Sequence, residues 1–201
     1  MRSGQVRHHE SYAKGRTLRK CDTRAHAVRP YKIMYDSSKH HRRSVRLEGH
    51  DYASAGWYFL TICAARRGEI FGRVVDNGVV LNRFGRIIQE QWSRVGAMRE
   101  EVTLDEWIVM PDHLHAIVAI QHSAPQDETI SPRAARSLAS LVAGFKSAVT
   151  SRINTVREQR TQVWQRNYWE HIIRDERDLN NTRRYILENP QRWTIRNMNQ
   201  P

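Results

Sequence analysis

The hydrophobic pattern changes its period several times after Trp57, and each change predicts a different element. Residues 57–63 (WYFLTIC) are aromatic and β-branched, which is typical of a buried strand. In residues 73–82, two valine-rich runs flank Asp76-Asn77-Gly78, and this arrangement predicts a β-hairpin. Asn82 then provides an N-cap for a helix that extends to roughly residue 95.

The second half of the chain continues this alternation of strands and helices. Two apolar strands, residues 102–110 and 114–120, are predicted on either side of a Pro111-Asp112 turn. A long amphipathic helix follows, with apolar residues three and four positions apart: Leu138, Leu141, Val142, Phe145, Val149 and Ile153. A short strand is expected at residues 162–164. A last helix is expected to begin at Asp175 and to end by Asn189, because Pro190 disfavours helical geometry in the residue before it.

This order of elements predicts the fold class. Strands that are adjacent in sequence favour antiparallel pairing, and the mixed helices must cover the sheet. The simplest packing is an α+β fold of the ferredoxin-like type, an antiparallel sheet with packed helices. Residues 1–33 lack apolar periodicity, so we expect a disordered basic extension, followed by one domain over residues 34–201.

Composition and charge narrow the classes of partner. The net charge is +12, which favours a polyanionic partner such as nucleic acid. Residues 1–33 hold nine Lys or Arg against Glu10 and Asp22, so much of the excess lies in the extension. No run of about 18 apolar residues and no signal peptide is visible, so we expect a cytoplasmic protein without a membrane partner.

The histidines at positions 113 and 115 are the first candidates for chemistry. Residues two apart on a strand point to the same side, so His113 and His115 present two imidazoles together. Two neighbouring imidazoles are half of a site for a divalent metal. The chain has 10 histidines, so such a spacing also arises by chance, and inward-pointing histidines that hydrogen-bond within the core remain an alternative.

The last helix supplies the second candidates. Tyr185 and Asn189 are four residues apart, which places them on one face of a continuous helix. A tyrosine oxygen and an amide oxygen on that face could meet the histidine pair, as a nucleophile and a third metal ligand. Without further information, an ordinary helix whose tyrosine packs on the sheet explains the pattern better.

Five segments together resemble the REP-associated tyrosine transposases, which belong to the wider single-tyrosine HUH transposases. The ordered set is far more specific than any one motif, and it extends from about Met34 to near the C-terminus. The segments are residues 39–44 (KHHRRS), 58–63 (YFLTIC), 107–115 (WIVMPDHLH), 164–175 (WQRNYWEHIIRD) and 185–190 (YILENP).

The resemblance implies a ferredoxin-like HUH endonuclease domain that cleaves and transfers single-stranded DNA through a 5′-phosphotyrosine intermediate. By motif position, Tyr185 is the nucleophile, and His113, His115 and Asn189 hold Mg²⁺ or Mn²⁺. The expected partner is single-stranded or hairpin DNA at palindromic repeats. For DNA contacts we expect Arg42, Arg43, Lys146 and Arg166, although surface cations are often merely solvated.

Two other functions stay open at this level. A non-catalytic relative could bind hairpins without cutting them, and a structural zinc domain could use the histidine pair. Tyr185 followed by Asn189 favours the enzyme over the pure binder. The lack of cysteine near the histidines disfavours structural zinc, which usually has thiolate ligands. The residues do not indicate whether the protein is a monomer or a homodimer.

Overall fold

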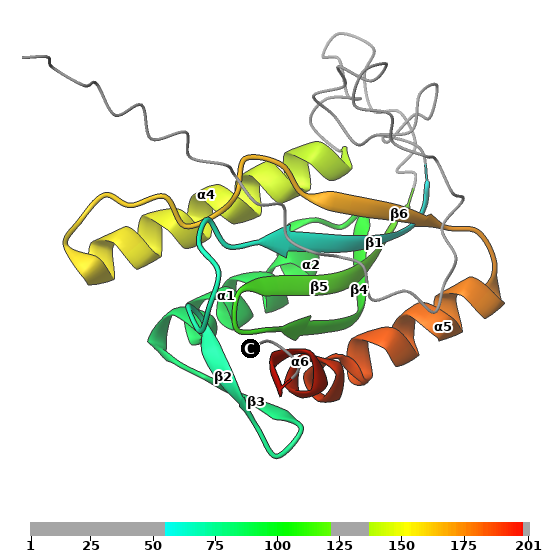
Figure 1. Ribbon diagram of the computed structural model, residues 1–201. Coiled ribbons are helices and arrows are strands. Elements are labelled where there is room, and N and C mark those ends of the chain that lie inside the picture. Colours follow the sequence, from blue (N-terminus) through cyan, green and yellow to red (C-terminus); the bar gives the residue numbers. More distant parts are fainter. Residues whose placement is uncertain (1–54, 122–136, 199–201) are drawn as a thin grey trace, which may run out of the picture.

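A four-stranded antiparallel sheet forms the centre of the computed structural model, which describes residues 55–121 and 137–198 (Figure 1). Its strand order is β4-β5-β1-β6, with every neighbouring pair antiparallel. The strands are β1 (Gly56–Cys63), β4 (Val102–Val109), β5 (His113–Ile120) and β6 (Trp169–Ile173). A helix-bearing segment separates β1 from β4 and another separates β5 from β6, so the predicted α+β ferredoxin-like class is confirmed.

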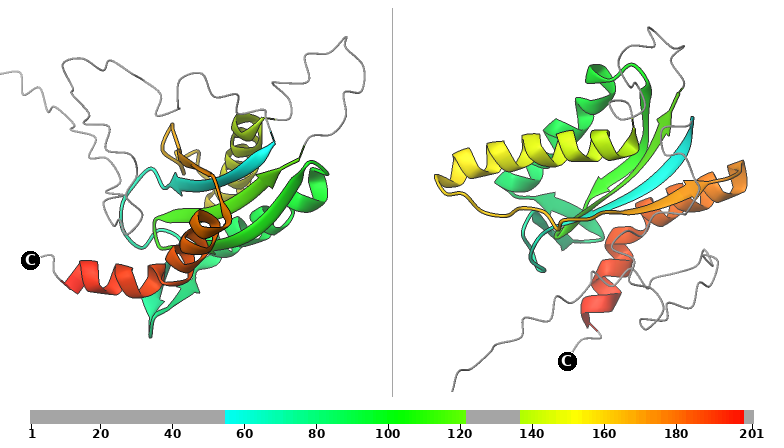
Figure 2. Two further views of the ribbon diagram at one scale, coloured as in Figure 1. Left: turned by 90° about the vertical axis from the view of Figure 1, so that its right-hand side faces the viewer. Right: turned by 90° about the horizontal axis from the view of Figure 1, so that it is seen from above.

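Helices cover both faces of this sheet. The helices α1 (Arg83–Ser93) and α4 (Leu138–Arg157) pack on one face, and α5 (Glu176–Leu187) lies across the other (Figure 2). All eight residues of β5 are buried, and they divide between the two faces by strand alternation. Leu114, Ala116 and Val118 belong to the large cluster under α1 and α4, whereas Ile117 belongs to a small cluster under α5.

The predicted hairpin and its following helix are confirmed. β2 (Gly72–Val75) pairs with β3 (Gly78–Leu81) through a two-residue turn at Asp76 and Asn77, whose φ angles are 48° and 62°. These positive angles suit a tight turn that matches the twist of the strands. The Asn82 side chain then accepts hydrogen bonds from the backbone N–H groups of Phe84 and Gly85, which caps α1 as expected.

The predicted strand at residues 162–164 is wrong in position. Trp164 makes one isolated bridge with Ala64, and the strand that extends the sheet is β6. β6 has the sequence Trp-Glu-His-Ile-Ile, and it lies at the edge of the sheet. An edge strand has one unpaired side and needs fewer apolar residues, so its hydrophobic pattern is weak.

The predicted helix that begins at Asp175 and ends by Asn189 is confirmed as α5, but another helix, which was not expected, follows it. The Asp175 side chain caps α5 at its start, and α5 ends at Leu187. A new helix, α6 (Asn189–Met198), begins after a single intervening residue and leaves in another direction (Figure 1). Pro190 lies in the first turn of α6. Backbone N–H groups in a first turn have no acceptor within the helix, so the N–H that proline lacks breaks no hydrogen bond there. The proline therefore starts a helix here besides ending one.

Part of the predicted domain organisation falls on residues that the structure does not describe. The boundary between residues 1–33 and 34–201 lies outside the described residues, as do Arg42 and Arg43. Within the ranges that are described, no helix combines the length and the apolar character needed to cross a membrane. Cys63 is buried at the end of β1.

A glycine in α1 supplies a test of this packing. A Cβ on Gly85 would collide with the backbone oxygen of Phe71, while a Cβ on Gly144 in α4 would meet no atom within 4 Å. We expect Gly85→Ala to lower the free energy of unfolding by about 1–3 kcal/mol through overpacking. Gly144→Ala should instead raise it by about 0.5–1 kcal/mol, because alanine is the better helix former. Urea unfolding of both variants measures the difference, and equal stabilities would contradict the packing of α1 against the Phe71 segment.

Candidate active site

The two histidines meet at the start of the central strand β5. His113 is 6% exposed and His115 is 3% exposed, and both lie on the α5 face of the sheet. Their Nε2 atoms are 3.0 Å apart, and their ring centroids are separated by 4.4 Å. The sequence spacing therefore does bring two imidazoles together, with the same ring nitrogen of each facing the other.

The opposite nitrogen of each ring has its own partner. Nδ1 of His113 lies 2.6 Å from Oδ1 of Asp112, and Nδ1 of His115 lies 2.9 Å from Oγ1 of Thr61. Thr61 is the register partner of His115 in the β1–β5 pair, so the pairing of the two strands places the Thr61 hydroxyl beside the His115 imidazole. An ionised carboxylate only accepts hydrogen bonds, so in the neutral tautomer of His113 that donates from Nδ1 to Asp112, Nε2 presents a lone pair.

This arrangement fits a divalent metal. When Nδ1 of His115 donates to Thr61, both Nε2 lone pairs face one another and need a shared cation or a proton. Two adjacent ligands at the 2.0–2.1 Å distances of an octahedral Mg²⁺ site stand about 3 Å apart, which is the separation found here. Asp112 and Thr61 would then orient the ligands from behind, as outer partners of metal-bound histidines commonly do.

Two histidines alone do not complete a metal site. Within the described residues, no group of three His, Cys, Asp or Glu side chains converges to hold an ion. A third protein ligand would therefore have to be of another chemical type, such as an amide oxygen. Oxygen ligands of this kind are what Mg²⁺ and Mn²⁺ accept.

Tyr185 lies beside this pair, on the neighbouring helix α5. Its ring centroid is 5.3 Å from that of His115 and 5.8 Å, edge-on, from that of Phe59. The guanidinium of Arg192 stands 5.8 Å from the centroid of the same ring. The side chain is half-buried, so it is held by the sheet while part of it stays open to solvent.

The position of Asn189 in the helices differs from the expectation. It does not share a helix with Tyr185, because it is the first residue of α6, and its side chain is 6% exposed. Trp193, four residues further along α6, places its ring 5.8 Å from that of His113. In sequence, Asn189 lies midway between Tyr185 and Trp193, whose rings lie beside those of His115 and His113. Its role as the third ligand remains a prediction.

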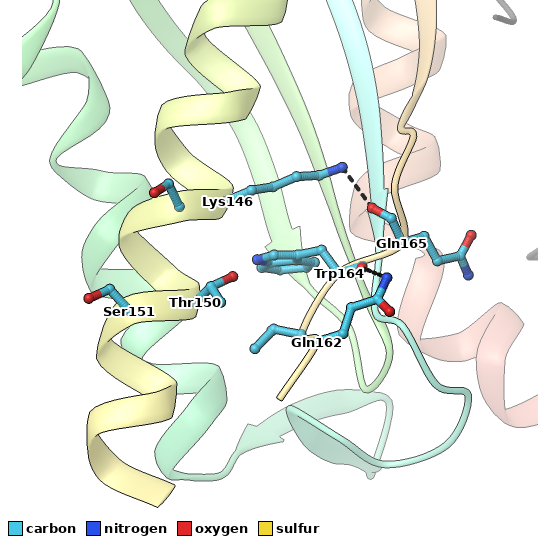
Figure 3. A pocket seen from close by; sticks show the side chains of 8 residues that line it. Lys146, Thr150, Ser151, Gln162, Trp164 and Gln165 are labelled. Carbon is cyan, nitrogen blue, oxygen red and sulfur yellow. Dashed lines mark hydrogen bonds between the residues drawn. The ribbon is translucent and has the colours of Figure 1, made fainter. Parts of the chain in front are cut away.

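Lys146 lies on the other side of the sheet, on α4. Its ammonium donates to the carbonyl oxygens of Gln165, Arg166 and Asn167 at 3.0–3.4 Å. Burial lowers the pKa of Lys146 to about 8. It borders a cavity of about 450 Å³ between α4 and residues 162–165 (Figure 3). Arg166 is exposed, and the proposed DNA contacts of both residues stay untested.

The sequence did not indicate several residues that line the histidine pair in the structure. Asp112 stood in the motif but was interpreted only as part of a turn. Thr61 and Phe59 belong to a strand whose register was unknown, and Trp193 belongs to a helix that was not expected. Only Asp112 carried a detectable signal, a carboxylate directly before the first histidine.

Comparisons with known proteins agree with the motifs. An uncharacterized Haemophilus influenzae protein is 36% identical over 169 residues, which cover 79% of this chain and 93% of that protein. A second protein of that organism, provisionally named a REP-associated tyrosine transposase, is 29% identical over 149 residues, 70% of this chain and 73% of its own length. No protein-family model matches the chain.

Two solved structures are similar to this chain at lower sequence identity than the two Haemophilus influenzae proteins. A REP-associated tyrosine transposase bound to a REP hairpin shares 20% identity with a TM-score of 0.44, over 68% of this chain and 67% of that one. A Deinococcus radiodurans protein provisionally named a transposase shares 20% identity with a TM-score of 0.36, over 72% of this chain and 98% of that one. By its sequence relatives and its motifs, the chain belongs to one family with the uncharacterized Haemophilus influenzae protein and is a relative of the REP-associated tyrosine transposases.

Proposed function

We propose that the protein cleaves and rejoins single-stranded DNA at palindromic hairpin repeats, with Tyr185 as nucleophile. His113, His115 and Asn189 would hold Mg²⁺ or Mn²⁺. One observation carries the proposal: the Tyr185 ring lies 5.3 Å from a histidine whose Nε2 faces that of a second histidine. A tyrosine and a pair of histidines thus come together from two elements that are far apart in sequence. The motif resemblance and the net charge of +12 support DNA as the substrate.

The reaction would follow from the positions of these side chains. The phenolic oxygen of Tyr185 would attack the scissile phosphorus and form a new phosphorus–oxygen bond. The bond from phosphorus to the DNA 3′-oxygen would break, which leaves a free 3′-hydroxyl and a 5′-phosphotyrosine link. Because the link keeps the energy of a phosphodiester, a 3′-hydroxyl can later reverse the step and rejoin DNA. A bound divalent metal would supply charge neutralisation at the phosphate.

The protein's own residues would do the positioning. Asp112 and Thr61 hold the two imidazole planes in place, and the half-buried ring of Tyr185 rests on Phe59 and His115. This arrangement limits the directions from which the phenolic oxygen can approach a phosphate bound at the histidines. Restricting the reactants to a near-attack geometry is itself a large source of rate enhancement.

Replacing the nucleophile is the first test. Tyr185→Phe removes one oxygen and keeps the ring contacts, so the covalent protein–DNA adduct should disappear while hairpin affinity stays within about twofold. Tyr168→Phe is the matched control and should still cut. A denaturing gel with labelled hairpin DNA and Mg²⁺ reports the adduct. Adduct formation by Tyr185→Phe but not by Tyr168→Phe would refute the assignment, and an unmodified protein that binds without cutting would favour the non-catalytic alternative.

Removing the metal is the second test. Chelation with EDTA should stop cleavage, and Mg²⁺ or Mn²⁺ should restore it. His113→Ala and His115→Ala should each remove most of the activity, and Asn189→Ala should raise the metal concentration needed. The thermal midpoint should change little on chelation, because a site with few protein ligands is not the main source of stability. Cooperative unfolding on adding EDTA would support the structural-zinc alternative instead.

The carboxylate behind His113 supplies a third test. Asp112→Asn keeps the shape but removes the charge that polarises the imidazole, so Mn²⁺ affinity measured by calorimetry should fall about 10–100-fold. Glu90→Gln is a suitable control, since the exposed Glu90 contacts Arg152 at 2.8 Å on the opposite side of the sheet. Equal Mn²⁺ affinities for Asp112→Asn and the unmodified protein would show that Asp112 does not act through the metal site.

A further inference from the structure

The helix α5, which carries Tyr185, packs on a smaller apolar cluster than the helices on the opposite face of the sheet. Three hydrophobic residues of this cluster are buried, Ile117, Ile173 and Ile186, and five more are partly buried against them: Trp57, Phe59, Ile108, Leu179 and Tyr185. Only Thr182 and Ile186 of α5 itself are buried. Apolar packing is non-directional, so such a narrow seam leaves rotation of the helix about its axis weakly resisted.

Two charged contacts attach α5 to the two edge strands of the sheet. Near its start, Oδ2 of Asp178 lies 2.9 Å from Nε2 of His171 on β6. Further along, Arg183 donates from Nε to Oδ1 of Asp105 on β4 at 2.8 Å and from Nη2 to Oδ2 at 2.6 Å. The second contact is a bidentate pair across 78 positions of sequence, and its planar geometry constrains direction as well as distance.

A bulge in β4 turns the side chain of Asp105 toward α5. Leu104 packs against the large core and Ile108 against the small one, although residues four apart on a regular strand share a face. The register shift between Leu104 and Trp107 accounts for this change of face. A bulge re-aims a side chain, and here Asp105 meets α5. The backbone N–H of Glu106 also donates to Oδ1 of Asp105 at 2.8 Å, which fixes the carboxylate.

We propose that Asp105 and Arg183 form a positioning pair that sets the rotation of α5 and thereby the place of Tyr185 beside the histidines. Successive helix residues are about 100° apart, so Arg183 and Tyr185 lie on opposite flanks of the Thr182–Ile186 seam. Because the helix is rigid, holding the Arg183 flank at β4 also fixes the rotational position of the Tyr185 flank, whose ring contacts those of Phe59 and His115. The Arg183 hydrogen bonds also lower the pKa of Asp105, so the carboxylate is charged at neutral pH.

The role in catalysis rests on the proposed function, and the test therefore includes a readout that needs no cleavage. Nuclear Overhauser effects between the Tyr185 and His115 rings report their contact in the full chain. Arg183→Ala and Asp105→Ala should weaken these signals, and the exchanged pair Asp105→Arg with Arg183→Asp should restore them. Asp105→Asn, which keeps one hydrogen-bond acceptor, should give an intermediate effect and serves if an alanine variant fails to fold.

The kinetic readout separates positioning from binding. At saturating hairpin DNA, the single-turnover rate of adduct formation should fall about 10–100-fold in each alanine variant, because a small misplacement of a nucleophile is costly. The hairpin dissociation constant should stay within about twofold. The control is the exposed pair Arg152–Glu90, which joins α4 to α1 at 2.8 Å, and its alanine variants should change neither readout.

The outcomes distinguish the two proposals. Unchanged ring contacts in folded Arg183→Ala and Asp105→Asn would overturn the positioning pair, as would an equal loss in the Arg152→Ala control. If the unmodified protein forms no adduct, the proposed function fails, yet the ring contacts still decide whether Asp105 and Arg183 position Tyr185. Restoration of contacts by the exchanged pair supports the positioning role in either case.

Discussion

The antiparallel pairing of β1 with β5 is the contact on which the rest of the molecule depends. It sets Thr61 opposite His115 and Cys63 opposite His113, and it leaves every residue of β5 buried. A strand that is buried on both faces must be covered on both, which calls for α1 and α4 on one side and α5 on the other. The same strand therefore carries core residues toward one layer and the two histidines toward the other.

The α5 side of the sheet differs from the opposite side because it holds buried polar groups as well as apolar ones. Imidazoles in an apolar site must find hydrogen-bond partners, and Asp112 and Thr61 satisfy the outer nitrogens at 2.6 and 2.9 Å. The Nε2 atoms of the two rings face one another at 3.0 Å, an arrangement that the proposed metal site would use. The apolar cluster on this side is smaller than the core on the other side, and directional polar contacts at both sheet edges accompany α5.

The break between α5 and α6 is the other feature that builds the site. Had the helix continued, Asn189 would have stayed one turn beyond Tyr185 on the same axis. Instead α6 begins at Asn189, and Trp193 reaches the ring of His113 while Tyr185 reaches that of His115. Two helices of different direction thus surround the histidine pair from two sides, with Asn189 buried at their junction.

The sequence by itself determined the elements with strong local signals: the buried strands, the hairpin at Asp76 and Asn77, the cap at Asn82 and the amphipathic helix. It also indicated the histidine pair, because strand alternation is a local property. Tertiary structure decided the edge strand β6, whose half-exposed position leaves little hydrophobic pattern, and the meaning of Pro190, which ends one helix and begins another. The contacts of Thr61, Phe59 and Asp105 depended on strand register and on a bulge, which arise from pairing between distant segments and leave no local trace.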